Sequence, residues 1–107
     1  MSDRYPALID TGSRVSCIDA TLAEELGLPT VEGVRQQVAG ILGSGVVDVY
    51  RARISIQELN LSVVGDFPGI QLAEGGQPYR ALVGRDILKS FTMAYDGKTG
   101  VVSLNTE

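Results

Sequence analysis

The sequence has no histidine, no tryptophan and a single cysteine, Cys17. Without histidine, a serine or cysteine nucleophile lacks its usual general base, and the commonest zinc ligand is missing as well. A single cysteine excludes an internal disulfide and is typical of a reducing compartment. Any catalysis must therefore depend on carboxylates, and we expect neither a cofactor nor a metal.

Positive charge is also scarce, with nine Lys and Arg against 13 Asp and Glu and a net charge of −4 over 107 residues. The basic residues are scattered, which argues against a nucleic-acid partner. The sequence has no signal-peptide pattern and no apolar run of membrane-spanning length, so we expect no membrane partner and favour a cytoplasmic location. The length predicts one domain, residues 1–107.

An apolar run, Ala7–Ile9, leads into Asp10, Thr11, Gly12 and Ser13. The run predicts a buried strand, and the glycine permits a tight turn after it. A carboxylate at the mouth of a core is partly desolvated and surrounded by hydrogen-bond donors, which is how proteins adjust an acid for chemistry. Asp10 is therefore the candidate catalytic residue. The alternative is a turn aspartate that only caps backbone amides.

A second apolar run, Ala81–Val83, leads into Gly84, Arg85 and Asp86 and repeats the first pattern near the other end of the chain. The chain thus consists of two related halves, and only the first carries the candidate acid.

Hydrophobic periodicity predicts a mostly β protein with two short helices. Asp19 is placed to cap the first helix, and Gly27 and Pro29 follow its end. Ile18, Leu22 and Leu26 would share its buried face. We expect strands at 4–9, 14–18, 61–64, 80–83, 91–95 and 101–104, helices at 20–26 and 86–90, a hairpin over 34–56, and an irregular segment at 66–79.

The tip of the long hairpin, residues 40–45, carries three glycines around Ile41 and Leu42. It is either an ordinary glycine-rich turn or a flap that closes over a ligand, because two exposed aliphatic side chains favour a covering partner. A phosphate-binding loop is excluded because the Lys-Ser/Thr ending is missing and no helix follows.

Three elements in this order resemble the retropepsins, the single-lobe aspartic proteases of retroviruses and their bacterial and cellular relatives. They are Asp10–Gly12 after an apolar strand, the glycine-tipped hairpin, and Val83–Leu88 before the last hairpin. The resemblance implies a small closed β-barrel with a flap. It also implies a homodimeric endopeptidase in which Asp10 of each subunit activates water against a peptide bond of a peptide or protein substrate.

The resemblance also implies roles for the neighbours of Asp10. Thr11 would form a hydrogen bond across the dimer interface, and Gly12 would allow close approach of backbone and substrate. We expect the Ser13 hydroxyl to donate to Asp10, which would favour its charged form and an acidic activity optimum. The flap residues expected to touch substrate are Ile41, Leu42 and Gly43, and the structural glycine turn would be Gly84, Arg85 and Asp86.

Two features depart from the family pattern. Only nine residues precede Asp10, where the family normally has about two more strands, so the domain is expected to lack them. Viral members carry an acid where this chain has Arg14, and that acid pairs with the arginine of the glycine turn; Arg85 must therefore have another partner. The alternative function is a weakly active domain that serves for dimerisation or peptide binding.

Overall fold

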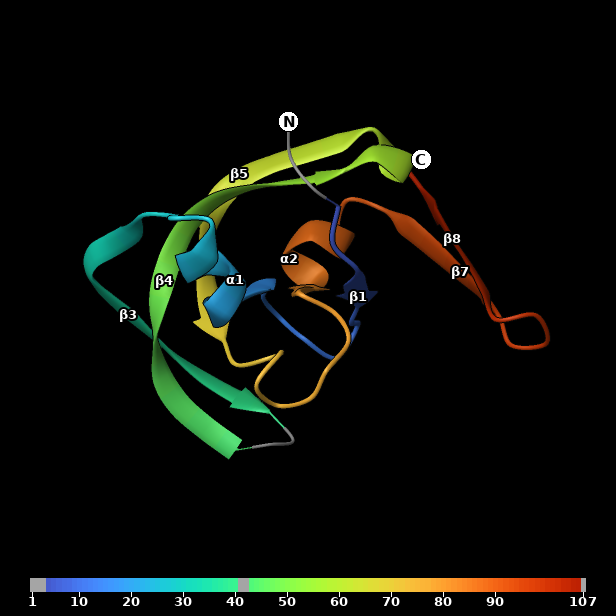
Figure 1. Ribbon diagram of the computed structural model, residues 1–107. Helices are drawn as coiled ribbons and strands as arrows, with labels where there is room; N and C mark the ends of the chain where they lie inside the picture. The colour runs from blue at the N-terminus through green and yellow to red at the C-terminus, as the bar shows by residue number, and fades with distance from the viewer. Residues whose placement is uncertain (1–3, 41–42, 107) are drawn as a thin grey trace.

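The computed structural model describes residues 4–40 and 43–106, and within them the chain is mostly strand (Figure 1). A six-stranded sheet has the order β1-β6-β2-β5-β4-β3, and β7 and β8 form a separate pair. The two helices are α1 (Ala20–Glu25) and α2 (Arg85–Leu88). The strands are β1 (Ala7–Ile9), β2 (Cys17–Asp19), β3 (Thr30–Gly40), β4 (Gly43–Ile56), β5 (Leu61–Ile70), β6 (Ala81–Val83), β7 (Thr92–Asp96) and β8 (Val101–Asn105), with a 3₁₀ turn, η1 (Gln57–Leu59), between β4 and β5.

The all-β expectation is confirmed, and both helices lie where the sequence predicts them. The sheet curves around α1 and α2 (Figure 1). Its strand order has β1 and β3 at the two ends, and closure into a barrel stays a prediction.

The short strands β1 and β6 bring the two halves of the chain together. They are parallel, with Ala7 opposite Ala81 and Ile9 opposite Val83. Parallel strands in register end at the same level, so the turn after β1 and the turn after β6 lie next to each other. The two glycine turns that the sequence pattern relates are therefore neighbours in space.

Several predicted boundaries were wrong. The first strand, expected at 4–9, is Ala7–Ile9, and the long hairpin, expected from 34, begins at Thr30. The strand expected at 61–64 continues to Ile70, because Asp66 and Pro68 pair with Arg51 and Val49 of β4. This long-range pairing outweighs the local turn signals of proline and glycine. The strand expected at 14–18 begins only at Cys17, since the backbone before it bonds to α2 instead.

Aliphatic and aromatic side chains form two buried clusters. One lies under α1 and consists of Ile18, Ala23, Tyr50, Ala52 and Phe67, and the other contains Val83, Ile87 and Leu88. Leu26 was expected on the buried face of the first helix, but it is 52% exposed because α1 ends at Glu25.

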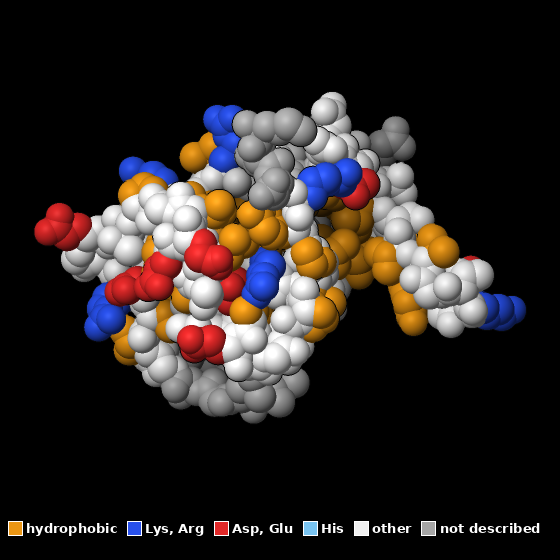
Figure 2. Space-filling model, in the orientation of Figure 1, with side chains coloured by type: hydrophobic (Ala, Val, Ile, Leu, Met, Phe, Trp, Pro, Cys, Tyr) orange, Lys and Arg blue, Asp and Glu red, His pale blue; other side chains and the backbone are white. Residues whose placement is uncertain are grey.

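The β7–β8 hairpin extends away from the body of the molecule (Figure 1). Its base is held by Phe91 and Leu104, which pack against the second cluster. Farther out, Tyr95 and its cross-strand partner Val102 are exposed. Figure 2 shows hydrophobic side chains on the flank of this hairpin. A two-stranded hairpin with an uncovered apolar face is only marginally stable in water, so this face is a candidate for contact with another surface.

Asp19 ties the first helix to the segment after β5. Its side chain is fully buried and accepts hydrogen bonds of 3.0 Å from the amides of Leu22, Leu72 and Ala73. Arg80 Nη1 lies 3.7 Å from the same carboxylate. The predicted helix cap is confirmed, and it also anchors the 71–79 segment, which the sequence does not reveal.

Replacing Asp19 by alanine is expected to lower the free energy of unfolding by about 3 kcal/mol, since it leaves amides in the interior without an acceptor. Urea denaturation measures the change. The control is Asp48→Ala, which removes an exposed ion pair with Arg35 and should cost less than about 0.5 kcal/mol. Equal losses for the two variants would show that Asp19 does not anchor the fold.

Candidate active site

Asp10 lies at the end of β1 in a tight turn. The turn is closed by a bond of 3.2 Å from the Ser13 amide to the Asp10 carbonyl. The carboxylate is partly buried, and its Oδ1 accepts a hydrogen bond of 2.9 Å from the Gly12 amide. A Cβ at position 12 would lie 3.2 Å from Oδ1, a crowded approach that glycine avoids. Thr11 and Gly12 are exposed, so this turn presents its carboxylate toward the surface.

The Asp10 turn is bound along its length to the end of β6 and the start of α2. The Asp10 amide donates to the Val83 carbonyl at 2.9 Å, and the Arg85 amide donates to the Ser13 carbonyl at 2.8 Å. Gly84 lies between them, where a Cβ would come within 2.7 Å of the Val15 backbone. Only glycine permits this approach, because real Cβ contacts are never so short.

The Asp86 carboxylate fixes the start of β2 to α2. It accepts hydrogen bonds from the Ser16 amide at 3.0 Å and from the Ser16 hydroxyl at 2.6 Å. The same hydroxyl accepts a bond of 2.9 Å from the Gly84 amide. Ser16 is fully buried, and sequence reasoning missed it; the one available signal was a small polar residue between Val15 and Cys17.

The hydrogen-bond partner of the Arg85 side chain lies in the Asp10 turn. Arg85 Nη1 donates to the Thr11 carbonyl at 2.8 Å. The arginine of the glycine turn thus bonds to a main-chain oxygen, where viral members of the resembled family use a carboxylate.

The hydroxyl of Ser13 has a different hydrogen-bond acceptor from the one expected. It donates to the Val15 carbonyl at 2.6 Å instead of to the Asp10 carboxylate. The short turn makes the nearby backbone acceptor available to this side chain, as is common for serine in turns. Ser13 therefore contributes to the shape of the loop, and the expected effect of its hydroxyl on the charge of Asp10 has no structural basis.

Two of the predicted flap residues, Ile41 and Leu42, lie outside the described residues. Gly43 opens β4 and pairs with Gly40 at the end of the β3–β4 hairpin. Contact of these residues with a substrate stays a prediction.

Cys17 lies directly after the Ser16 contact and is buried. Burial, with a smaller contribution from the negative charges of Asp86 and Asp10, raises the pKa of its thiol to about 11. A thiol with so high a pKa carries little thiolate at neutral pH, so the interpretation of Cys17 as a core residue is supported.

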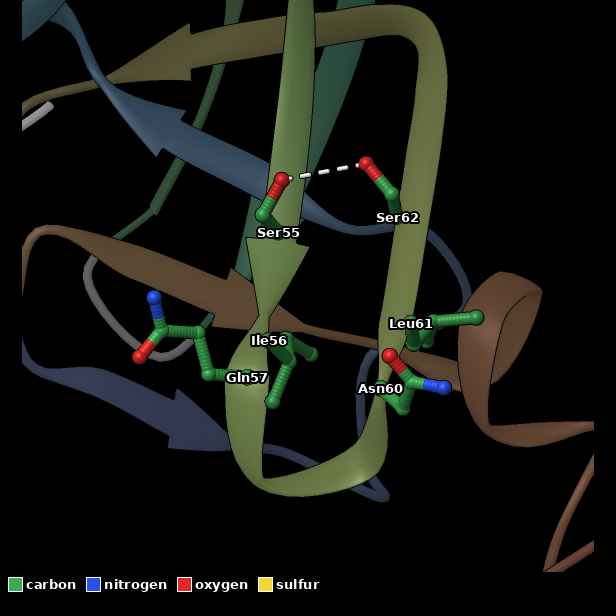
Figure 3. A pocket seen from close by; sticks show the side chains of 6 residues that line it. All are labelled: Ser55, Ile56, Gln57, Asn60, Leu61 and Ser62. Atoms are coloured by element: carbon green, nitrogen blue, oxygen red, sulfur yellow. Dashed lines mark hydrogen bonds between the residues drawn. The ribbon is translucent and has the colours of Figure 1, made fainter. Parts of the chain in front are cut away.

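A shallow pocket of about 210 Å³ lies at the turn between β4 and β5 (Figure 3). It is lined by Ser55, Ile56, Gln57, Asn60, Leu61 and Ser62, and the two serine hydroxyls are 3.0 Å apart. It contains no charged side chain and no residue of the Asp10 turn. Ligand pockets usually enclose roughly 300 Å³ or more, so this hollow is not the candidate site.

Residues 4–40 and 43–106 contain no group of three or more His, Cys, Asp or Glu that could hold a metal ion. The same part of the chain has no helix long and apolar enough to cross a membrane.

A mostly β fold that presents an Asp-Thr-Gly turn, held by a glycine turn from the other half of the chain, is the arrangement that the resemblance to the aspartic proteases predicts. A family model described as aspartyl protease matches residues 2–86, and the chain belongs to this retropepsin-like family. The match ends within α2, so the β7–β8 hairpin lies beyond it. Searches of curated proteins and of solved structures gave no significant match.

Replacing Gly84 by alanine is expected to lower the free energy of unfolding by about 2–3 kcal/mol, because the new Cβ would force the 13–15 backbone away. Gly45→Ala is the control, since its Cβ would meet nothing within 4 Å. Thermal unfolding measures both. A Gly84→Ala protein as stable as the control would show that the two turns are not in close contact.

Cys17 in the native protein is expected to react with iodoacetamide at pH 8 about 100-fold more slowly than in the unfolded chain. This factor follows from a pKa of about 11 against the ordinary value of 9.0, and burial slows the reaction further. Mass spectrometry follows the alkylation with and without urea. Similar rates in the two states would contradict the buried position.

Proposed function

We propose that this chain is an aspartic endopeptidase whose active site forms from Asp10 of two copies. The observation that carries the proposal is the exposure and the hydrogen bonding of the Asp10 carboxylate. This carboxylate lies in an exposed Asp-Thr-Gly turn with an amide donor at 2.9 Å, and no carboxyl group of the described residues is hydrogen-bonded to it. Peptide hydrolysis with carboxyl groups requires both a base and an acid. Asp10 of a second copy of the chain would supply the second carboxyl group.

The chemistry follows from two carboxyl groups held close together. Both cannot ionise at low cost, so the pair shares one proton. The ionised carboxylate removes a proton from water as the water oxygen attacks the peptide carbonyl carbon, and the other carboxyl protonates the carbonyl oxygen. The tetrahedral intermediate then collapses. One hydroxyl of the intermediate gives its proton to the ionised carboxylate as the carbonyl re-forms and the C–N bond breaks, and the leaving nitrogen takes a proton from the other carboxyl. The products are a carboxylic acid and an amine, and the dyad again holds one shared proton.

The substrate would be an extended peptide. A peptide lying under the β3–β4 hairpin can add main-chain hydrogen bonds as an extra strand, which gives affinity with limited dependence on sequence. By the resemblance, Ile41 and Leu42, which lie outside the described residues, would supply apolar contact with its side chains.

The surface of the molecule is compatible with association of two copies. Leu8 and Ile9 of β1 are 38% and 40% exposed immediately before Asp10, and β1 is an edge strand. Edge strands with apolar side chains favour pairing with another chain. A two-fold axis near Thr11 would bring the two Asp10 turns together and leave these side chains for the interface.

Asp10→Asn is expected to abolish cleavage of a peptide library at acidic pH, a loss of at least about 1,000-fold. Asp66→Asn, which changes an exposed ion pair with Arg51, is the control and should retain activity. Cleavage that persists in Asp10→Asn would disprove the role of Asp10. Peptide binding without cleavage by a verified dimer would favour the binding-module alternative.

Mixing the wild type with Asp10→Asn tests whether the site is shared. In an equimolar mixture, about a quarter of random dimers carry two intact Asp10 residues, so activity should follow the square of the wild-type fraction. Sedimentation equilibrium confirms that the subunits exchange. A linear dependence would mean that each copy works alone.

A further inference from the structure

Arg85 and Asp10 are connected through a single peptide group. The Thr11–Gly12 peptide accepts a hydrogen bond at its carbonyl from Arg85 Nη1, at 2.8 Å. The amide of the same peptide donates to Asp10 Oδ1, at 2.9 Å. We propose that Arg85 is a positioning residue for Asp10, acting through the Thr11–Gly12 peptide. This inference rests on the proposed function, in which Asp10 is the reacting carboxyl.

The geometry fixes the orientation of this peptide from two sides. Arg85 also donates its main-chain amide to the Ser13 carbonyl at 2.8 Å, so one residue binds the carbonyls on both sides of Gly12. The backbone of Arg85 is held by this bond, and Gly84 before it lies too close to Val15 to admit a side chain. Rotation of the Thr11–Gly12 peptide, which would turn its amide away from Asp10, would break the Arg85 bond.

The positive charge of Arg85 strengthens the hydrogen bond from the Gly12 amide to Asp10 Oδ1. A guanidinium bonded to a carbonyl oxygen draws electrons from the amide, and the N–H on the other side becomes a better donor. The Gly12 amide therefore holds Asp10 Oδ1 more firmly.

Other charged groups around the turn do not substitute for Arg85. Asp86 is engaged by Ser16. Arg14 lies in the same loop with an exposed side chain, and its main-chain carbonyl accepts from the Asp86 amide. Arg85 is thus the cation that bonds to the Thr11–Gly12 peptide.

Arg85→Met removes every side-chain donor and keeps a long stem at an exposed position, so the protein should fold. In ¹⁵N–¹H spectra of the labelled protein, the Gly12 amide proton is expected to move upfield and to exchange faster with solvent. Arg85→Gln should shift the signal in the same direction by less, and it keeps the measurement available if the methionine variant does not fold. Arg85→Lys should restore part of the wild-type shift. Arg53→Met, on the exposed face of β4, is the control and should leave the Gly12 signal unchanged.

Kinetics supply the second readout. In Arg85→Met, kcat for peptide hydrolysis is expected to fall about 10- to 100-fold while KM changes less than about twofold, because misplacement of Asp10 affects the chemical step. A Gly12 signal that is unchanged in folded Arg85→Met would overturn the inference. A shifted Gly12 signal in Arg85→Met, together with a wild type that cleaves no peptide, would support the coupling of Arg85 to Asp10 and reject the proposed function, so the two can fail separately.

Discussion

The contact between the Asp10 turn and the Gly84 turn is the constraint on which the rest of the site depends. Main-chain bonds join Asp10 to Val83 and Arg85 to Ser13, and there is no room for a side chain at position 84. The partners are more than 70 residues apart in sequence, as the Arg85–Thr11 bond shows. The intervening strands β2 to β5 close this long loop, and their packing offsets the entropy lost in closing it.

Three aspartates of the fold have different surroundings, which separates the two that hold the backbone from the proposed catalytic residue. Asp19 is buried with three amide donors, and Asp86 accepts bonds from both the amide and the hydroxyl of Ser16. Both carboxylates are committed to holding the backbone. Asp10 accepts one amide donor on one oxygen and is partly exposed, so it is the least committed of the three to holding the backbone.

Local features could be predicted from the sequence because they depend on near neighbours. The position of the strand before Asp10, the Asp19 cap and the short helix at 85–88 all follow from patterns within a few residues. The expected burial of that strand was wrong, because all three residues of β1 are exposed. The extent of β5, the role of Ser16, and the partners of Ser13 and Arg85 could not be predicted. Each depends on which acceptor or strand the fold brings alongside, and a periodic pattern contains no such information.

The departure at Arg14 and the bond from Arg85 to Thr11 have a common explanation. With a cation at position 14, Arg85 has no carboxylate in the loop to pair with, and it bonds to a main-chain carbonyl instead. A carbonyl does not titrate, whereas an aspartate partner would be protonated as the pH falls through the ordinary carboxyl range. A catalytic dyad needs one of its own carboxyls protonated, so it works best in or near that range. The Arg85–Thr11 contact of the turn therefore involves no carboxylate, in contrast to the Asp86–Ser16 bonds that hold the backbone next to it.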